Sequence, residues 1–216
     1  MPPRRASDLP TRPRRPYAPR MAPERRREHL LDAALSVILE HGYAGVSVEA
    51  VARAAGVTRP VIYDHFPNLS QLVYALIERE ERCALEQLQA AVPDEPETDD
   101  PVGLLVGGVG RFLQAVSERP ATWRIILLPP EGTPSLVRRH IESNRARTLE
   151  RIEQVVRAAL AQAGRLDLLD TELIARAIRD LCEEAGRMVL TDPDRYPPAR
   201  YEQFVQSVMD LFWTVS

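Results

Sequence analysis

The sequence predicts an all-helical fold, because apolar residues recur at helical spacing in the segments between breaks rich in Pro and Gly. The spacing is clear in residues 23–41, where Leu31, Ala34, Leu35 and Ile38 fall on one face. Ser, Thr, Pro and Gly residues flank several such segments, as they do at helix ends. The chain has 216 residues, enough for one large or two small domains.

Composition places the chain among globular proteins and argues against several other classes. It is 44% apolar and 27% charged. No apolar run approaches the ~20 residues that cross a bilayer, and the N-terminus lacks the apolar segment of a secretory signal. We therefore expect a cytoplasmic protein without a membrane partner. Cys83 and Cys182 stand alone and predict two unreactive thiols, with no metal site, disulfide or cofactor.

Catalytic motifs are also missing from the sequence. The four histidines are spread along the chain without ligand spacing, and neither a nucleophile elbow nor a P-loop is present. We therefore do not expect an enzyme.

Charge is divided unevenly along the chain. Residues 1–66 hold 11 arginines against 7 acids, whereas the remainder holds 17 against 24. A basic N-terminal end favours a nucleic-acid partner. Residues 1–23, with seven Pro and six Arg, predict a disordered tail, because little apolar surface is available to offset its ordering. Its arginines could follow a DNA backbone or remain solvated.

Residues 24–68 predict a three-helix domain that contains a helix-turn-helix. After the first helix, Ser47 is a good N-cap for a second, and Gly56 can end that helix in the left-handed conformation. Thr58 offers another N-cap, and Pro60 then suits the first turn of a third helix.

The third helix would present most of its side chains to a partner. Ile62 and Phe66, four residues apart, form its inward face. The remaining side chains point outward or sideways: Arg59, Val61, Tyr63, Asp64 and His65. A helix this short is marginal alone, which favours a role in presenting these groups.

The stretch GYAGVSVEAVARAAGVTRPVIYDHF resembles the DNA-binding domain of the TetR family of bacterial regulators. The residues that carry the resemblance are Gly42-Tyr43, Ser47, Val51-Ala52, Ala55-Gly56-Val57 and Ile62-Tyr63-Asp64-His65-Phe66. The resemblance implies a dimeric regulator of double-stranded DNA, with a helical body that binds a small-molecule effector.

The candidate DNA-binding residues are Ser47, Val48, Glu49, Thr58, Arg59, Pro60, Val61, Tyr63, Asp64 and His65. Glu49 departs from the family's pattern, because relatives can carry a basic residue there. Arg59 suits bidentate binding to guanine, and Val61 could touch a thymine methyl. By the family's pattern Tyr63 and His65 touch phosphates, although either could instead have a structural role. Glu49 could accept from cytosine N4, or face Arg53 and leave binding unaffected.

The rest of the chain predicts a connecting helix at residues 69–91 and an effector-binding and dimerisation domain at 92–216. The segment 92–101, with three Pro and five acids, is a break. Helices are then expected at 102–118, 120–128, 135–163 (with Ser135 as cap), 171–190 and 198–215. Glycines at 107, 108 and 110 weaken a helix, so either close packing or space for a ligand should offset them.

In this family a ligand pocket would lie between the helices at 102–118, 120–128 and 135–163. Its candidate lining residues are Phe112, Trp123, Ile126 and Leu127, each of which could equally be ordinary core. The last two helices have broad apolar faces, which by resemblance form a homodimer but would also fit a monomer core.

The predicted function is a regulator, chiefly a repressor released from a palindromic operator by a small molecule. Activation stays open. The alternative is a non-sensing structural or nucleoid DNA-binding protein. A filled pocket would favour that alternative, and a void of about a few hundred Å3 would favour the sensor.

Overall fold

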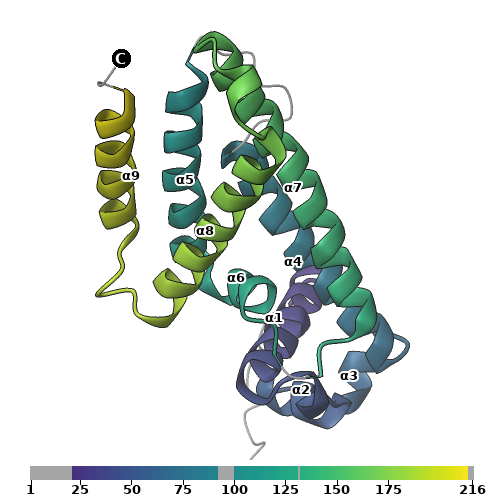
Figure 1. Ribbon diagram of the computed structural model, residues 1–216. Coiled ribbons are helices and arrows are strands. Elements are labelled where there is room, and N and C mark those ends of the chain that lie inside the picture. The colour runs from purple at the N-terminus through teal and green to yellow at the C-terminus, as the bar shows by residue number, and fades with distance from the viewer. Residues whose placement is uncertain (1–20, 92–99, 131, 214–216) are drawn as a thin grey trace, which may run out of the picture.

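The computed structural model describes residues 21–91, 100–130 and 132–213, and every regular element in these ranges is a helix (Figure 1). The α-helices are α1 (Pro23–His41), α2 (Val48–Ala54), α3 (Arg59–Tyr63), α4 (Leu69–Ala91), α5 (Pro101–Glu118), α6 (Pro120–Leu127), α7 (Ser135–Gln162), α8 (Thr171–Thr191) and α9 (Pro198–Trp213). Two 3-10 helices are η1 (Tyr43–Gly45) and η2 (Leu166–Leu168). The all-helical prediction is confirmed. The predicted tail lies almost wholly outside the described residues.

The head consists of α1, α2, α3 and the first turns of α4, which share one core at the lower end of Figure 1. Leu30, Ile38, Val51, Ile62 and Leu72 are all fully or almost fully buried there. These residues come from all four helices, so the short α2 and α3 are stabilised by tertiary packing and not by their own propensity.

The body is built around α5, which packs against α4, α7, α8 and α9. Its glycines allow close approach: a Cβ at Gly110 would lie 2.5 Å from Oε1 of Glu202 on α9. The atoms that this Cβ would meet belong to the outer part of one flexible and exposed side chain, so the expectation that close packing offsets the glycines of this helix stays a prediction. Helices α8 and α9 both lie along α5, and α8 also packs on α7 (Figure 1).

The short helix α6 lies where the head meets the body. Ile125 is buried in the head core, whereas Trp123 and Leu127 are buried in the main body core. Ile126 is partly buried and packs against both. This one helix therefore touches the two parts of the molecule at the same time.

Of three predicted helix caps, Ser47 is confirmed, Thr58 is confirmed in position only, and Ser135 is wrong. The Ser47 hydroxyl accepts from the Ala50 amide at 3.1 Å, as expected. Thr58 occupies the N-cap position of α3 with extended backbone, but its side chain makes no capping hydrogen bond. Pro134, not Ser135, is the N-cap of α7, because Ser135 is already the first helical residue and its hydroxyl makes no capping bond.

Candidate DNA-binding surface and ligand cavity

A tight turn sets α3 against α2. Gly56 takes the left-handed conformation at φ +63°, which a residue with a side chain rarely adopts. The turn is closed by backbone bonds from the Gly56 amide to the Arg53 carbonyl and from the Val57 amide to the Ala52 carbonyl, at 3.2 and 2.9 Å. The ring of His29 on α1 donates to the Ala55 carbonyl at 2.9 Å, which fastens the end of α2 to α1.

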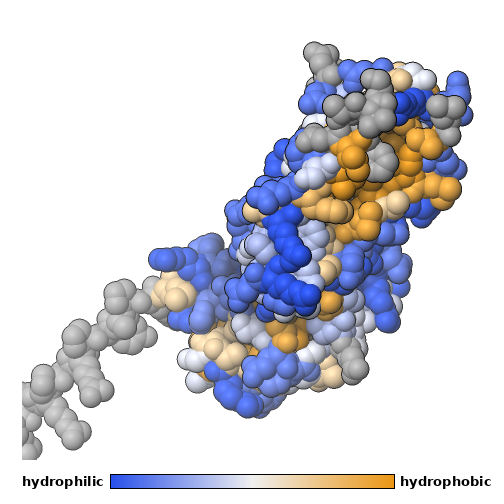
Figure 2. Space-filling view, turned by 60° about the vertical axis from the view of Figure 1, so that its left-hand side comes forward, coloured by the Kyte–Doolittle hydropathy of each residue, from blue (hydrophilic) through white to orange (hydrophobic). Residues whose placement is uncertain are grey.

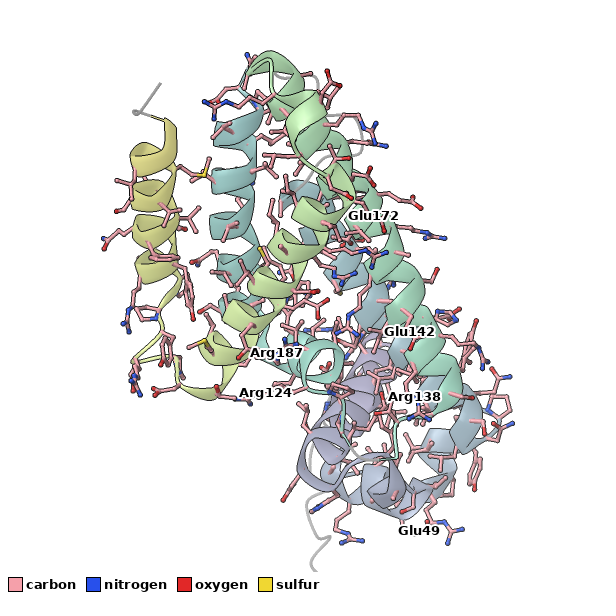
Figure 3. All side chains as sticks on the ribbon, viewed as in Figure 1. Glu49, Arg124, Arg138, Glu142, Glu172 and Arg187 are labelled. Atoms are coloured by element: carbon pink, nitrogen blue, oxygen red, sulfur yellow. The ribbon has the colours of Figure 1, made fainter. Side chains whose placement is uncertain are left out.

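Most of the candidate DNA-binding residues lie on the outer surface of the head. The exposed ones are Glu49, Thr58, Arg59, Pro60, Tyr63 and Asp64. Ser47, Val61 and His65 are half-buried. Val48 is only 9% exposed and belongs to the head core, so its side chain is turned away from a partner. Figure 3 shows Glu49 at the outer end of the head, pointing away from the body.

Glu49 is paired with Arg59, which links the start of α2 to the start of α3. Glu49 Oε1 and Arg59 Nη1 are 3.0 Å apart. The interpretation that Glu49 faces Arg53 is therefore wrong. Both side chains are more than half exposed, and such surface pairs contribute only about 0–1 kcal/mol. Arg59 can therefore exchange Glu49 for a base edge at little cost.

Tyr63 and His65 make no side-chain hydrogen bond within the part of the chain that the structure describes. The side chain of Tyr63 is 48% exposed, so its hydroxyl is free to donate to a phosphate. His65 lacks the internal hydrogen bond that a purely structural role would predict, in contrast to His29.

A cavity of about 100 Å3 lies in the body between α4, α5, α6, α7 and α8. Phe112 and Trp123 form an edge-to-face pair in its wall, with ring centres 5.1 Å apart. Leu127 also lines it, whereas Ile126 does not. The other apolar lining side chains include Leu88, Leu105, Val109, Ile141, Ile152 and Ile178. Gly108, without a side chain, leaves room at the wall.

Several lining residues were not anticipated from the sequence. Asn144 and Arg145 come from α7, and Cys182 and Glu183 come from α8, a helix expected only to dimerise. One feature of the sequence could have indicated a polar group at the cavity: Arg145 lies four residues after Ile141, on the inward face of α7. A charge within an apolar stripe is expensive unless it has a partner.

Burial raises the pKa of the Cys182 thiol to about 11, and the neighbouring Glu183 carboxylate adds to the effect. The thiolate is the reactive form. Cys182 therefore stays protonated near neutral pH, which agrees with the prediction of an unreactive thiol.

A chain of polar contacts joins the head to α6. Arg79 on α4 donates to Glu28 and Asp32 of α1 at 3.1 and 2.7 Å, and to its neighbour Glu80. Glu80 is 4% exposed and accepts from the Thr122 hydroxyl on α6. Burial alone would lower the pKa of Arg79, but the hydrogen bonds and charges of these acids outweigh burial and raise it. The guanidinium therefore stays charged and holds α1, α4 and α6 together.

The outer faces of α8 and α9 carry large apolar side chains that this single chain leaves exposed. Leu173 and Leu181 on α8 are 63% and 71% exposed, and Phe204 and Leu211 on α9 are 64% and 66% exposed. Figure 2 shows hydrophobic surface gathered on the part of the body far from the head. Among the described helices, none combines the length and apolar character needed to cross a membrane.

Comparisons with known proteins cover both parts of the chain. The family model described as "Bacterial regulatory proteins, tetR family" matches residues 30–76. The model described as "AefR-like transcriptional repressor, C-terminal domain" matches residues 109–215. Together the two models span the head and most of the body.

Individual relatives agree with these models. The HTH-type transcriptional regulator AcrR of Shigella flexneri is 38% identical over 73 residues, which is 32% of this chain and 34% of AcrR. The chain thus aligns with only about a third of that relative. The nucleoid occlusion factor SlmA of Vibrio campbellii is 26% identical over 188 residues, covering 83% of this chain and 91% of SlmA.

Solved structures share the fold. The transcriptional regulator FadR from Bacillus subtilis, in complex with stearoyl-CoA, superposes with a TM-score of 0.62 at 18% identity, covering 84% of this chain and 96% of FadR. The match of family models to both head and body leads to one assignment. The chain is a DNA-binding transcriptional regulator that belongs to the TetR family.

Proposed function

We propose that this chain is a repressor that binds a palindromic operator as a homodimer and releases it when a small molecule enters the body cavity. The observation that carries the proposal is the position of α6. Its Trp123 and Leu127 line the cavity, while its Ile125 is buried in the head core. A ligand that favours one position of α6 would shift the head, to the extent of its differential affinity for the two states.

The proposed division of labour follows the chain. Residues 24–68 bind DNA, residues 69–91 connect, and residues 92–216 bind the effector and dimerise through α8 and α9. Two-fold symmetry would place two α3 helices ~34–36 Å apart, in successive major grooves. Arg59 reads guanine, and the Tyr63 hydroxyl and His65 contact phosphates. A protein with a chromosomal operator would work in the cytoplasm.

Two of the comparisons support repression and sensing. The body matches a model described as a transcriptional repressor domain. FadR, which shares the fold, is a regulator in complex with stearoyl-CoA.

A second candidate is a non-sensing nucleoid protein with the same fold. Its support is the similarity to the nucleoid occlusion factor SlmA along 83% of this chain. The cavity is also smaller than the ~300–1,000 Å3 of drug-sized ligand sites. A non-sensing protein would occupy many genomic sites and would keep its DNA affinity in the presence of any small molecule.

The experiment that tests the proposal is selection of bound sequences from random double-stranded DNA, followed by mapping to the genome. We expect an enriched inverted repeat with a guanine in each half-site and few genomic matches, located at promoters. Failure to enrich any sequence at low ionic strength would contradict operator binding. Enrichment of hundreds of dispersed sites would favour the nucleoid candidate.

A further inference from the structure

The charged groups that line the body cavity neutralise each other. Arg145 on α7 donates through Nε and Nη2 to the two carboxylate oxygens of Glu183 on α8, both at 2.8 Å. The Glu183 side chain is only 17% exposed. Arg187, also on α8, lies 3.6 Å from the same carboxylate. Bidentate pairs of this kind are strong, and separating one leaves an uncompensated charge.

The second guanidinium at the cavity is also occupied. Arg179 donates through Nε and Nη2 to Oδ1 of Asp180, at 2.9 and 2.6 Å. The Asp180 side chain is 63% exposed, so its pair with Arg179 is weak and contributes little to selectivity. An anionic ligand would still have to displace Glu183 from Arg145, and the Glu183 carboxylate would repel it. A cationic ligand would have to take Glu183 from both Arg145 and Arg187. The cavity disfavours either charge.

The strongest neutral hydrogen-bonding group left for a ligand is Asn144. It lines the cavity, and its side-chain amide makes no hydrogen bond within the described part of the chain. Thr148 donates to the Asn144 carbonyl at 3.0 Å, and the indole of Trp123 donates to Gln87 at 3.0 Å. The Cys182 thiol also lines the cavity but is only a weak donor. An amide can both donate to and accept from a ligand hydroxyl or carbonyl.

The shape of the cavity limits the size of the ligand. The volume is about 100 Å3, with the edge-to-face rings of Phe112 and Trp123 in the wall. Dry apolar cavities of roughly 150 Å3 in other proteins accept benzene. The cavity here is smaller than that, so a single ring with short substituents is the largest group that it can take, and only if the wall side chains shift; a long molecule exceeds it.

We infer that the cavity selects a compact, neutral, ring-containing molecule with one hydrogen-bonding group, such as an alkylphenol, whose polar group binds Asn144. The self-neutralised pair of Arg145 and Glu183 rejects the ionised counterpart of the same size. This inference rests on the proposed function, because it names the effector class of the proposed sensor.

Three probes with the same ring test the inference: 4-ethylphenol, 4-ethylbenzoate and 4-ethylbenzylamine. At pH 7 the phenol is neutral, the benzoate is anionic and the amine is cationic. Calorimetric titration of the full-length protein should show the phenol binding at least tenfold more tightly than either ionised probe. Equal or tighter binding by the benzoate or the amine overturns the inference, and so does the absence of binding by all three.

Two variants locate the selectivity. Glu183→Gln removes the partner of Arg145 and should raise benzoate affinity at least tenfold, whereas Asn144→Leu should lower phenol affinity at least fivefold. Glu172→Gln is the matched control, because Glu172 pairs with Arg176 at the exposed surface of the same helix, and it should leave all three affinities unchanged. Thermal unfolding of each variant checks that it folds. If Glu183→Gln does not fold, the ratio of phenol affinity to ionised-probe affinity in the wild-type protein still tests the inference.

Operator binding is measured separately, without a probe. If the protein binds its selected operator but does not bind the phenol at least tenfold more tightly than the ionised probes, only the inferred effector class is contradicted. If it shows this preference for the phenol but binds no DNA, the proposed function is contradicted.

Discussion

Arg59 and Glu49 form the most informative pair of residues on the head. In the free protein they hold each other at 3.0 Å across the turn between α2 and α3. When Arg59 approaches a guanine, the Glu49 carboxylate faces the same groove, where it repels phosphates but can accept from a cytosine N4 amino group. We therefore expect Glu49 to lower general DNA affinity and to increase the preference for particular sites.

Replacing Arg59 by alanine should relax sequence preference. A bidentate contact to guanine supplies ~1–3 kcal/mol of discrimination, or roughly 5- to 150-fold. Competition binding measures the ratio of the affinities for the selected operator and for a site in which the guanine is replaced. In the variant this ratio should fall towards one. Arg53→Ala, at the exposed end of α2, is the control and should lower affinity for both sites alike. An unchanged ranking of sites in Arg59→Ala would show that another residue reads the base.

Tyr63→Phe should weaken binding to every sequence by a similar factor. A hydroxyl that donates to a phosphate contributes ~1.5–3 kcal/mol, so the loss should be tenfold or more. Because tyrosine is uncharged, the slope of affinity against salt should stay as in the wild type. Fluorescence anisotropy at several salt concentrations measures both quantities. An unaltered affinity would mean that Tyr63 has no phosphate contact.

At the residue scale, the sequence predicted those features that depend on residues close by in the chain. The Ser47 cap and the inward positions of Ile62 and Phe66 follow from local spacing, and all three hold. The partner of Glu49 could not be predicted, because it depends on how the turn sets α3 against α2. Thr58 has the right residue type for a cap, but its hydroxyl does not reach an amide.

At the scale of elements, α6 is the part that touches both the cavity and the head core, which is why we propose that it couples sensing with DNA binding. The Thr122 hydroxyl holds the buried Glu80, which shares Arg79 with two acids of α1. The next residue, Trp123, lines the cavity. A shift of α6 would therefore change contacts both at the cavity and at the head.

Thr122→Val should destabilise the protein by ~1–3 kcal/mol, because it leaves a buried carboxylate oxygen of Glu80 without a donor. Urea unfolding measures the loss. Thr191→Val is the matched control, since the Thr191 hydroxyl donates only to exposed helix backbone, and it should change the free energy of unfolding by less than ~0.5 kcal/mol. Equal stability of both variants would mean that the buried network contributes little.

The helices themselves were largely predictable, and the cavity was only partly so. Periodicity and the Pro and Gly breaks predict each long helix to within a few residues. They do not show which face of α8 meets α7, so Cys182 and Glu183 were missed as lining residues. Ile126 was placed on the cavity because it is an apolar residue of α6, but it lies between the head and the body.

At the scale of the whole molecule, the proposed contact with a second copy of the chain involves the face that carries the exposed apolar side chains of α8 and α9. The exposed apolar side chains of α8 and α9 lie on the body, away from the DNA-binding end. A regulator that reads a palindrome needs both heads on one rigid body, because each short α3 contacts few bases. Membership of a family of transcriptional regulators also agrees with the expectation that the chain is not an enzyme.

Placing a carboxylate on this face should separate the copies. Leu181→Glu and Phe204→Glu each bury an unpaired charge in the proposed interface. Light scattering should report the 24.3 kDa monomer for both variants, and twice that mass for the wild type. Leu169→Glu, at a site 52% exposed outside α8 and α9, is the control and should remain dimeric. A wild-type monomer would remove the basis for a palindromic operator.

The most direct measurement of the central claim, that two coupled α3 helices occupy successive major grooves, is affinity as a function of half-site spacing. Operators with the selected half-sites moved apart in single-base steps are titrated with the wild-type protein. The account predicts one sharp optimum near one helical turn, ~10 base pairs between half-site centres, and a large loss when five base pairs are added. An affinity that does not vary with spacing would contradict it.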